Sequence, residues 1–190
     1  MSPSITTLGV EVSAAEQVRQ LTRVVTDFPV NGVSFSDLTP VFADGPAFAA
    51  VIKALAAWTD RVDLIAGIDA RGFLLGSGVA LQLGVGVLPV RKAGKLPPPV
   101  YAQTYTLEYG TATLEVPAKA VPLAGRRVLV VDDVLATGGT VAAAVALLRR
   151  CEAEVVGVAV VLEVAGLGGR ELLLAGPEEG RVALHCLVPA

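Results

Sequence analysis

One segment in the second half of the chain limits the possible folds more than any other. Residues 128–131 are four consecutive apolar residues, and such a run predicts a buried strand. The acids Asp132 and Asp133 mark the end of this strand, and a turn of small residues then leads into an apolar segment, 141–148, that predicts a helix. A buried strand that enters a helix through a tight turn is the repeating unit of a parallel sheet covered by helices.

The rest of the chain continues this alternation of strands and helices. No repeat, low-complexity segment or long linker divides the 190 residues, so we expect a single domain, 1–190. The predicted class is α/β, with a parallel twisted sheet flanked by helices. Helices are expected from a capping box at Ser13 to about Asp27, from 44–46 to about Trp58 and over 73–83; strands are expected at 64–68, 85–91, 155–162 and 182–187; a hairpin is expected at 101–108 and 111–116.

The turn after the acids has the composition of a phosphate-binding loop. Its backbone N–H groups and the positive end of the helix dipole meet at one place beyond the sheet. Gly138 and Gly139 carry no Cβ that would block an anion, and the hydroxyls of Thr137 and Thr140 can donate to phosphate oxygens. From Ala136 onward the turn has no lysine that would reach the outer phosphates of a nucleoside triphosphate. This favours a single terminal phosphate monoester.

The two acids complete this candidate site. Ionised carboxylates accept two hydrogen bonds each and suit the vicinal hydroxyls of a sugar, so Asp132 and Asp133 beside a phosphate turn indicate a ribose 5-phosphate. The alternative is a strand–turn–helix unit whose acids only cap the helix. Adjacent acids repel each other unless something binds them, and this favours the ligand site.

A second turn and a basic segment are candidates for binding another anion. Residues 69–72 follow a buried strand, and Arg71 with neighbouring N–H groups can form an anion nest; the alternative is an exposed arginine that starts a helix. Arg91, Lys92 and Lys95 precede three prolines in a stretch that we expect to be a mobile flap over the site. The alternative for this basic run is a solvated surface.

Composition excludes several classes of function. The formal net charge of -3 and the pI of about 5.2 argue against general binding of nucleic acid. The apolar stretches are shorter than the roughly 18 residues of a membrane span, and the N-terminus has no pattern of a secretion signal. Cys151 and Cys186 are too few for a disulfide scaffold or a zinc cluster, so we expect a cytoplasmic protein. The lone His185 is expected to be packed rather than catalytic.

Further motifs accompany the acids and the turn in a fixed order. They are Phe28-Pro29 with Gly32, Phe35, Asp37, Thr39 and Pro40, followed by 65–73, 91–97, 107–110 and 169–171. With these motifs the chain resembles the type I phosphoribosyltransferase family, and in particular its adenine-specific members. The resemblance covers most of the chain.

The resemblance implies a purine-salvage reaction in which adenine displaces pyrophosphate from 5-phosphoribosyl 1-diphosphate and AMP is formed. It implies Mg²⁺ that is bound through the substrate and not directly by protein residues, and a homodimer as the assembly. It also implies a small N-terminal hood that recognises the base, residues 1–45, and a flexible flap with its hairpin, residues 91–117.

The candidate residues follow from the motifs and the resemblance together. Glu108 is the family's proton-handling residue for the purine, and Asp132, Asp133 and Arg71 complete the catalytic set. The other candidates are Ala136, Thr137, Gly138, Gly139 and Thr140 for the 5-phosphate; Asp69, Ala70, Arg71, Gly72, Arg91, Lys92 and Lys95 for the diphosphate; and Ser34, Phe35, Ser36 and Val134 for the base.

Two positions depart from the family pattern. Asn31 stands where the family commonly has proline, and Ser36 stands where an arginine is frequent. These departures keep other purine bases, hypoxanthine, guanine or xanthine, open as acceptors. A regulator that senses the diphosphate sugar, or a protein that binds it without catalysis, are the alternatives from other classes.

Overall fold

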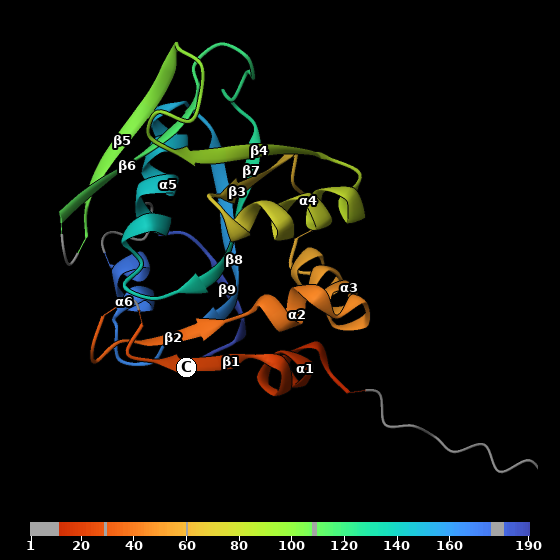
Figure 1. Cartoon of the computed structure of the whole chain (residues 1–190). Coiled ribbons are helices and arrows are strands. Elements are labelled where there is room, and N and C mark those ends of the chain that lie inside the picture. Colours follow the sequence, from red (N-terminus) through yellow and green to blue (C-terminus); the bar gives the residue numbers. More distant parts are fainter. Residues whose placement is uncertain (1–11, 29, 60, 108–109, 176–180) are drawn as a thin grey trace, which may run out of the picture.

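The central feature of the fold is a mostly parallel sheet. The computed structural model describes residues 12–28, 30–59, 61–107, 110–175 and 181–190. In this part of the chain the sheet has seven strands in the order β5-β6-β4-β3-β7-β8-β9 (Figure 1). The strands are β3 (Leu64–Ile68), β4 (Gly86–Lys92), β5 (Val100–Leu107), β6 (Gly110–Pro117), β7 (Arg127–Leu135), β8 (Glu154–Glu163) and β9 (Leu184–Val188).

The neighbouring strands β4, β3, β7, β8 and β9 run parallel, whereas β6 is antiparallel to β4 and to β5. The expected α/β class is therefore confirmed, and the hairpin of β5 and β6 extends one edge of the sheet. The helices are α1 (Ala14–Leu21), α2 (Thr39–Ala43), α3 (Gly45–Ala56), α4 (Arg71–Leu83), α5 (Gly139–Arg150) and α6 (Gly169–Leu174). None of the helices in the described residues is long and apolar enough to cross a membrane.

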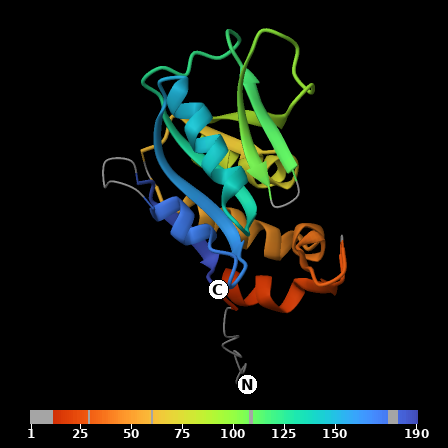
Figure 2. The same ribbon diagram turned by 90° about the vertical axis from the view of Figure 1, so that its left-hand side faces the viewer.

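Helices cover both faces of the sheet, and β7 shows why its apolar run is continuous. Val128 and Val130 pack in a core with α5 and α6, while Leu129 and Val131 pack in a second core with α1, α2, α3 and α4. Successive side chains of a strand point to opposite faces, so residues 128–131, which are covered on both sides, are apolar throughout. Figure 2 shows α5 along one face of the sheet, beside the hairpin.

Glycines allow α4 to lie close to the sheet. A Cβ on Gly67 of β3 would stand 2.6 Å from the carbonyl oxygen of Gly72, and a Cβ on Gly72 would stand 2.7 Å from the carbonyl oxygen of Val131 on β7. Neither backbone can move away without disturbing the sheet, so we expect alanine at either position to cost about 1–3 kcal/mol of stability. This close packing sets the first residue of α4, Arg71, beside the end of β7.

The N-terminal region differs from the sequence prediction. Ser13 does cap α1, because its side chain accepts a hydrogen bond from the N–H of Glu16 at 3.2 Å. The helix ends at Leu21, however, and not near Asp27. Residues Arg23–Thr26 form a strand, β1, that pairs with β2 (Ser34–Asp37) in a separate antiparallel sheet. The β-branched residues of β1 favour a strand, and the partner strand decides between the two structures.

The prediction for the acid pair also needs correction. Asp132 and Asp133 do not end β7, which continues to Leu135. The reason is that β8 is long enough to pair with this extension, with Asp132 opposite Val160 and Leu135 opposite Glu163. The acids therefore lie within a paired strand, and this holds their backbone in place. The basic segment also begins in regular structure, because Arg91 and Lys92 are the last residues of β4.

Candidate active site

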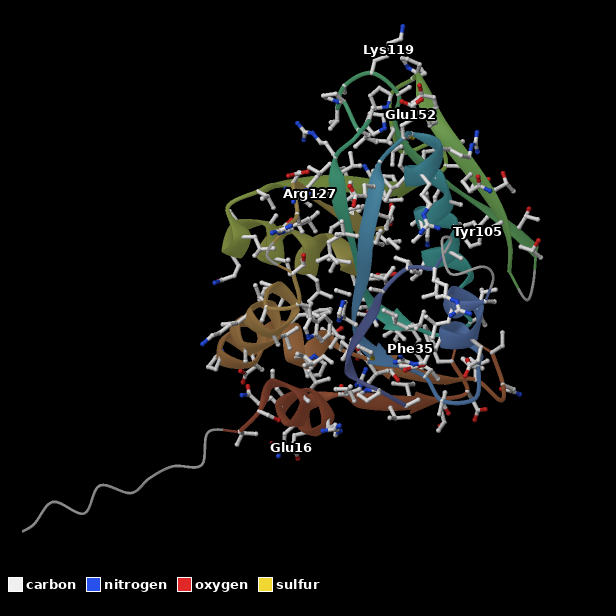
Figure 3. All side chains as sticks on the ribbon, turned by 180° about the vertical axis from the view of Figure 1, so that it is seen from behind. Glu16, Phe35, Tyr105, Lys119, Arg127 and Glu152 are labelled. Atoms are coloured by element: carbon white, nitrogen blue, oxygen red, sulfur yellow. The ribbon has the colours of Figure 1, made fainter. Side chains whose placement is uncertain are left out.

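A cleft of about 1000 Å³ lies at the carboxyl ends of the parallel strands. Ligand sites of open α/β sheets occur at this edge, because the turns between strands and helices meet there. The two-stranded sheet of β1 and β2 forms one wall of the cleft. Tyr105 of β5 lines the cleft at a different place from Phe35 of β2 (Figure 3). Several separate parts of the chain thus contribute to the lining. The predicted site residues among them are Ser34, Phe35, Ser36, Asp69, Ala70, Arg71, Lys92, Asp132, Asp133, Val134, Ala136 and Thr140.

The predicted phosphate turn surrounds a small cavity of about 90 Å³ beside this cleft, and its lining includes all five residues from Ala136 to Thr140. Helix α5 begins at Gly139, and the carbonyl of Gly138 accepts its first backbone hydrogen bond from Ala142 at 2.8 Å. The N–H groups of a first helical turn have no acceptor within the helix, so they are available to an anion in this cavity.

Helix α6 supports this turn from behind. Gly138 has a φ of +81°, and a Cβ on it would stand 2.8 Å from the carbonyl oxygen of Gly169, the first residue of α6. A Cβ on Gly169 would in turn overlap the carbonyl oxygen of Ala136. Arg170 fixes α6 to the sheet through Glu163 of β8, with 2.6 Å between Nη2 and Oε2. The motif at 169–171 therefore has a structural reason: it holds the predicted phosphate turn in shape.

The acid pair is largely removed from solvent. The Asp133 residue is 4% exposed, and its backbone N–H donates to Oδ1 of Asp132 at 2.9 Å. Burial raises the pKa of Asp132 well above its ordinary value, and the charge of Asp133 raises it further. Burial also raises the pKa of Asp133, although the nearby Arg71 opposes this shift. The pair therefore carries its second negative charge at a cost in free energy, which hydroxyl donors or cations in the cleft would offset.

Arg71 is already engaged with one of these acids. Its Nε lies 2.7 Å from Oδ2 of Asp133, and its guanidinium carbon lies 5.1 Å from the centre of the Phe35 ring. The contact with Asp133 is ionic, since the buried Oδ2 receives no aligned hydrogen bond from the described residues. A cation at a helix N-terminus is unfavourable, and the carboxylate compensates for this position. Arg71 therefore does more than start a helix, because its side chain also lines the cleft.

The other predicted diphosphate residues fall into two groups. Asp69, joined to Ala70 by a cis peptide bond, lines the cleft with Arg71 and Lys92, and its Oδ2 accepts a hydrogen bond from the Lys92 N–H at 3.4 Å. Arg91 and Lys95 do not line the cleft. The Nη1 of Arg91 donates to the carbonyl of Lys95 at 3.2 Å, and its guanidinium lies over the Phe73 ring at 5.7 Å. Gly72 contributes only the close packing described above.

The predicted base strip forms strand β2. Ser34, Phe35 and Ser36 all line the cleft, and so does Val134 from the far end of β7. The Phe28 ring meets the Phe35 ring edge to face, with 5.2 Å between centres, and this contact supports the aromatic side chain in its place. Glu108, the predicted proton-handling residue, lies outside the described residues.

These observations can be compared with known proteins. Residues 41–175 match the phosphoribosyl transferase domain family. The chain belongs to this family. The adenine phosphoribosyltransferase of Rhodococcus jostii is 63% identical over 161 residues, which cover 85% of this chain and 91% of that protein. The adenine phosphoribosyltransferase of Mycobacteroides abscessus is 65% identical over 156 residues, which cover 82% and 88%.

Solved structures of the family agree in fold. The adenine phosphoribosyltransferase of Thermoanaerobacter pseudethanolicus matches with a TM-score of 0.85 and 40% identity, over 93% of this chain and 99% of that one. The Saccharomyces cerevisiae enzyme, complexed with a dideoxyimino-altritol bisphosphate and adenine, matches with a TM-score of 0.84 and 36% identity, over 92% and 98%. The resemblance that the motifs indicated is thereby confirmed.

The sequence did not single out every residue that this phosphoribosyltransferase brings to the site. Tyr105 lines the cleft and contacts Thr140, yet its position in an alternating strand gave no functional signal. Glu163 at the end of β8 forms an ion pair with Arg170 of α6, and no local sequence pattern reveals this pair. His185 is packed as expected, with its ring stacked on Trp58 at 5.0 Å between centres.

Proposed function

We propose that this phosphoribosyltransferase joins adenine to the sugar of 5-phosphoribosyl 1-diphosphate and so forms AMP and pyrophosphate in purine salvage. One observation carries the proposal: the same cleft is lined by a phosphate turn, a buried acid pair and an aromatic strand. Adenine as the base is supported by the names of the two relatives above, which are 63% and 65% identical to this chain.

The phosphate turn is assigned to the 5-phosphate of the donor. The first N–H groups of α5 and the hydroxyls of Thr137 and Thr140 supply hydrogen bonds to its oxygens. The φ of +81° at Gly138 gives the turn its shape without strain. No cation is needed in the turn, because the helix terminus itself attracts the anion.

The acid pair is assigned to the ribose hydroxyls. Departure of pyrophosphate leaves positive charge on the sugar ring, and a carboxylate held close to the ring stabilises this charge. Asp133 contacts Arg71 in the structure, and a bound diphosphate competes for that guanidinium because it carries more negative charge than one carboxylate. Exchange of partners would give the leaving group a cation and free Asp133 to accept from the sugar.

The strand β2 is assigned to adenine. Phe35 offers a ring on which a purine can stack, and Val134 offers an apolar contact. Ser34 and Ser36 carry no charge, so we assign recognition of the base to hydrogen bonds from the backbone and the hydroxyls of this strand. Ser36 in place of the frequent arginine is compatible with this mode of recognition. Glu108 is assigned to proton transfer at the base from the resemblance.

The donor atoms of the cleft fit Mg²⁺. Asp132 and Asp133 present hard carboxylate oxygens to the cleft, one of them the buried Oδ2 of Asp133 without an aligned hydrogen bond from the described residues, and such oxygens suit the hydroxyls and waters around a hard cation. The described residues include no group of three or more His, Cys, Asp or Glu that could hold a metal. Mg²⁺ would be held through the bound donor, as the family resemblance implies, with Asp132 and Asp133 orienting the sugar hydroxyls. When bound, the ion neutralises the charge of the leaving group.

We also propose a homodimer in the cytoplasm. Leu74 and Leu81 are 53% and 83% exposed and stand seven residues apart on α4, so they share one helix face. Exposed apolar side chains on one face suit contact with a second copy. Sedimentation velocity at micromolar concentration tests the homodimer, and a monomer at that concentration would contradict it.

The free thiols Cys151 and Cys186 support a reducing compartment.

A base-competition assay tests the function. Pyrophosphate release is measured with adenine, hypoxanthine, guanine and xanthine, each with Mg²⁺ and with excess EDTA. We expect adenine to be preferred in kcat/KM by about 100-fold or more, and turnover to require Mg²⁺. Equal rates with another base would assign a different purine transferase. Tight donor binding without release of pyrophosphate under any condition would indicate a non-catalytic binding protein or regulator.

A further inference from the structure

Tyr105 connects the hairpin to the phosphate turn. Its hydroxyl lies 3.2 Å from Oγ1 of Thr140, in the first turn of α5, and both residues line the large cleft. The phenol ring is partly buried against the core that α5 shares with the sheet. Figure 3 shows the position of Tyr105 on the hairpin. The contact joins residues that are 35 positions apart in the chain, so only the tertiary structure reveals it.

The surrounding contacts hold this pair in place. Strand β5 runs along α5, and a Cβ on Gly139 would lie 3.8 Å from the Tyr105 ring, at ordinary contact distance. At the other end of the helix, Nη1 of Arg150 donates to the carbonyl of Ala102 at 3.0 Å and to Oε1 of Gln103 at 2.8 Å. Strand β5 therefore contacts α5 at both ends of the helix.

The hydrogen-bonding capacity of the two hydroxyls determines their direction once phosphate is bound. A phosphate dianion only accepts hydrogen bonds, so a Thr140 hydroxyl that contacts it must use its single proton for that contact. The Thr140 oxygen can then only accept, and Tyr105 must be its donor. Hydrogen bonds in such a chain strengthen one another, because each donor becomes more polarised.

We propose that Tyr105 is a positioning residue for the 5-phosphate, which donates to Thr140 and thereby directs the Thr140 proton at the phosphate. This inference rests on the proposed placement of the 5-phosphate at the turn. Tyr105 acts through Thr140 and touches neither the sugar nor the base.

The test is the Tyr105→Phe variant of the full-length protein, which keeps the ring and removes only the hydroxyl. Dissociation constants are measured for AMP and for adenosine, which lacks the phosphate, together with KM for both substrates. We expect Tyr105→Phe to weaken AMP binding about 3- to 10-fold, as for one hydrogen bond, and to raise KM for the phosphoribosyl donor similarly. Adenosine binding and KM for adenine are expected to stay within twofold. Tyr101→Phe is the matched control, because Tyr101 lies on the same strand and does not line the cleft.

Thr140→Val and the double variant separate this inference from the function on which it depends. If Thr140→Val lowers the preference for AMP over adenosine and Tyr105→Phe adds nothing to it, the proposed chain of hydrogen bonds is supported. If Thr140→Val lowers that preference but Tyr105→Phe does not, the inference about Tyr105 is wrong and the phosphate site stands. If neither variant changes the preference, the 5-phosphate is not at this turn. Equal weakening of AMP and adenosine by Tyr105→Phe would indicate a structural role and would also overturn the inference.

Discussion

Two neighbouring turns at one edge of the sheet each join a strand to a helix, but their side chains differ in charge. Strand β3 leads through Asp69 and Ala70 into α4, and the adjacent strand β7 leads through residues 136–138 into α5. The first turn carries an acid, and its helix begins with Arg71. The second turn carries only small and hydroxyl residues. We infer that a strand–turn–helix unit provides the place for an anion and that its side chains decide which anion is bound.

The difference extends to the state of each turn without a ligand. The second turn offers backbone N–H groups that are fixed by α5 and braced by α6, so it needs no rearrangement to accept a phosphate. The first turn has its cation paired with Asp133, 2.7 Å away. We therefore expect the diphosphate turn to exchange partners on binding and the phosphate turn to be preformed.

The largest effect is expected from Asp133→Asn, which removes the acid that links the two turns. The variant loses the carboxylate that stabilises positive charge on the ring, so kcat should fall by about 10²–10³-fold. The free energy of unfolding should change little, because removal of a charge whose burial raises the pKa of Asp133 offsets the loss of the ion pair with Arg71. Steady-state kinetics and thermal melts at pH 7.5 check both points. Turnover within twofold of the parent protein would contradict the assignment.

A smaller effect on catalysis is expected from Arg71→Ala, which removes the cation from the first turn. We expect KM for the phosphoribosyl donor to rise about 10-fold, since a charge-assisted contact to the diphosphate is lost. The variant should also lose about 1 kcal/mol of stability, because Asp133 is left buried without its partner while a third of the Arg71 side chain is exposed.

Two further variants sharpen the comparison with Arg71→Ala. Stability should return in the double variant Arg71→Ala/Asp133→Asn, which has no unpaired charge, and chemical denaturation measures this. Lys95→Ala is the comparison variant, because it removes a basic side chain that does not line the cleft. A rise in KM with Lys95→Ala as large as with Arg71→Ala would show that the basic segment closes over the diphosphate during turnover.

The smallest effect is expected from Asp132→Asn on the pH dependence of stability. The pKa of Asp132 is raised in the folded state, so the folded protein holds this proton over a pH range in which the unfolded chain has lost it. The contribution of Asp132 to stability therefore falls as pH rises from about 4 towards the raised pKa. Asp132→Asn should increase Tm slightly near pH 8 and less at pH 5. A decrease in Tm at pH 8 would show that ionised Asp132 is stabilised in the fold.

Local patterns were sufficient for the elements that surround the site. The capping side chain of Ser13, the strand Leu64–Ile68 and the hairpin after Val100 follow from capping, apolar runs and alternation. The same patterns failed where a partner strand decides the outcome. Residues 23–26 form β1 because β2 pairs with them, and β7 continues past its acids because β8 is long enough to pair there. Neither partner is near in sequence.

Candidate residues could be named from sequence when their chemistry is local. Glycines and threonines before a helix, and two acids after a run of apolar residues, indicate a phosphate and a sugar without knowledge of the fold. The ion pair of Arg71 with Asp133 and the contact of Tyr105 with Thr140 join residues from separate elements. No spacing along the chain encodes such pairs, so sequence reasoning treated Arg71 as an independent anion ligand and did not consider Tyr105.

The amino-acid sequence by itself determined the α/β class, and it singled out the turn of residues 136–140 and the acid pair as a candidate site, because each depends on residues that are consecutive in the chain. Only the tertiary structure decided which charges are already paired, how deeply the acids are buried and where the hairpin rests. The physical reason is that pKa values, ion pairs and the direction of a shared proton depend on distances between elements. Those distances are set by the packing of α4 and α5 against the sheet.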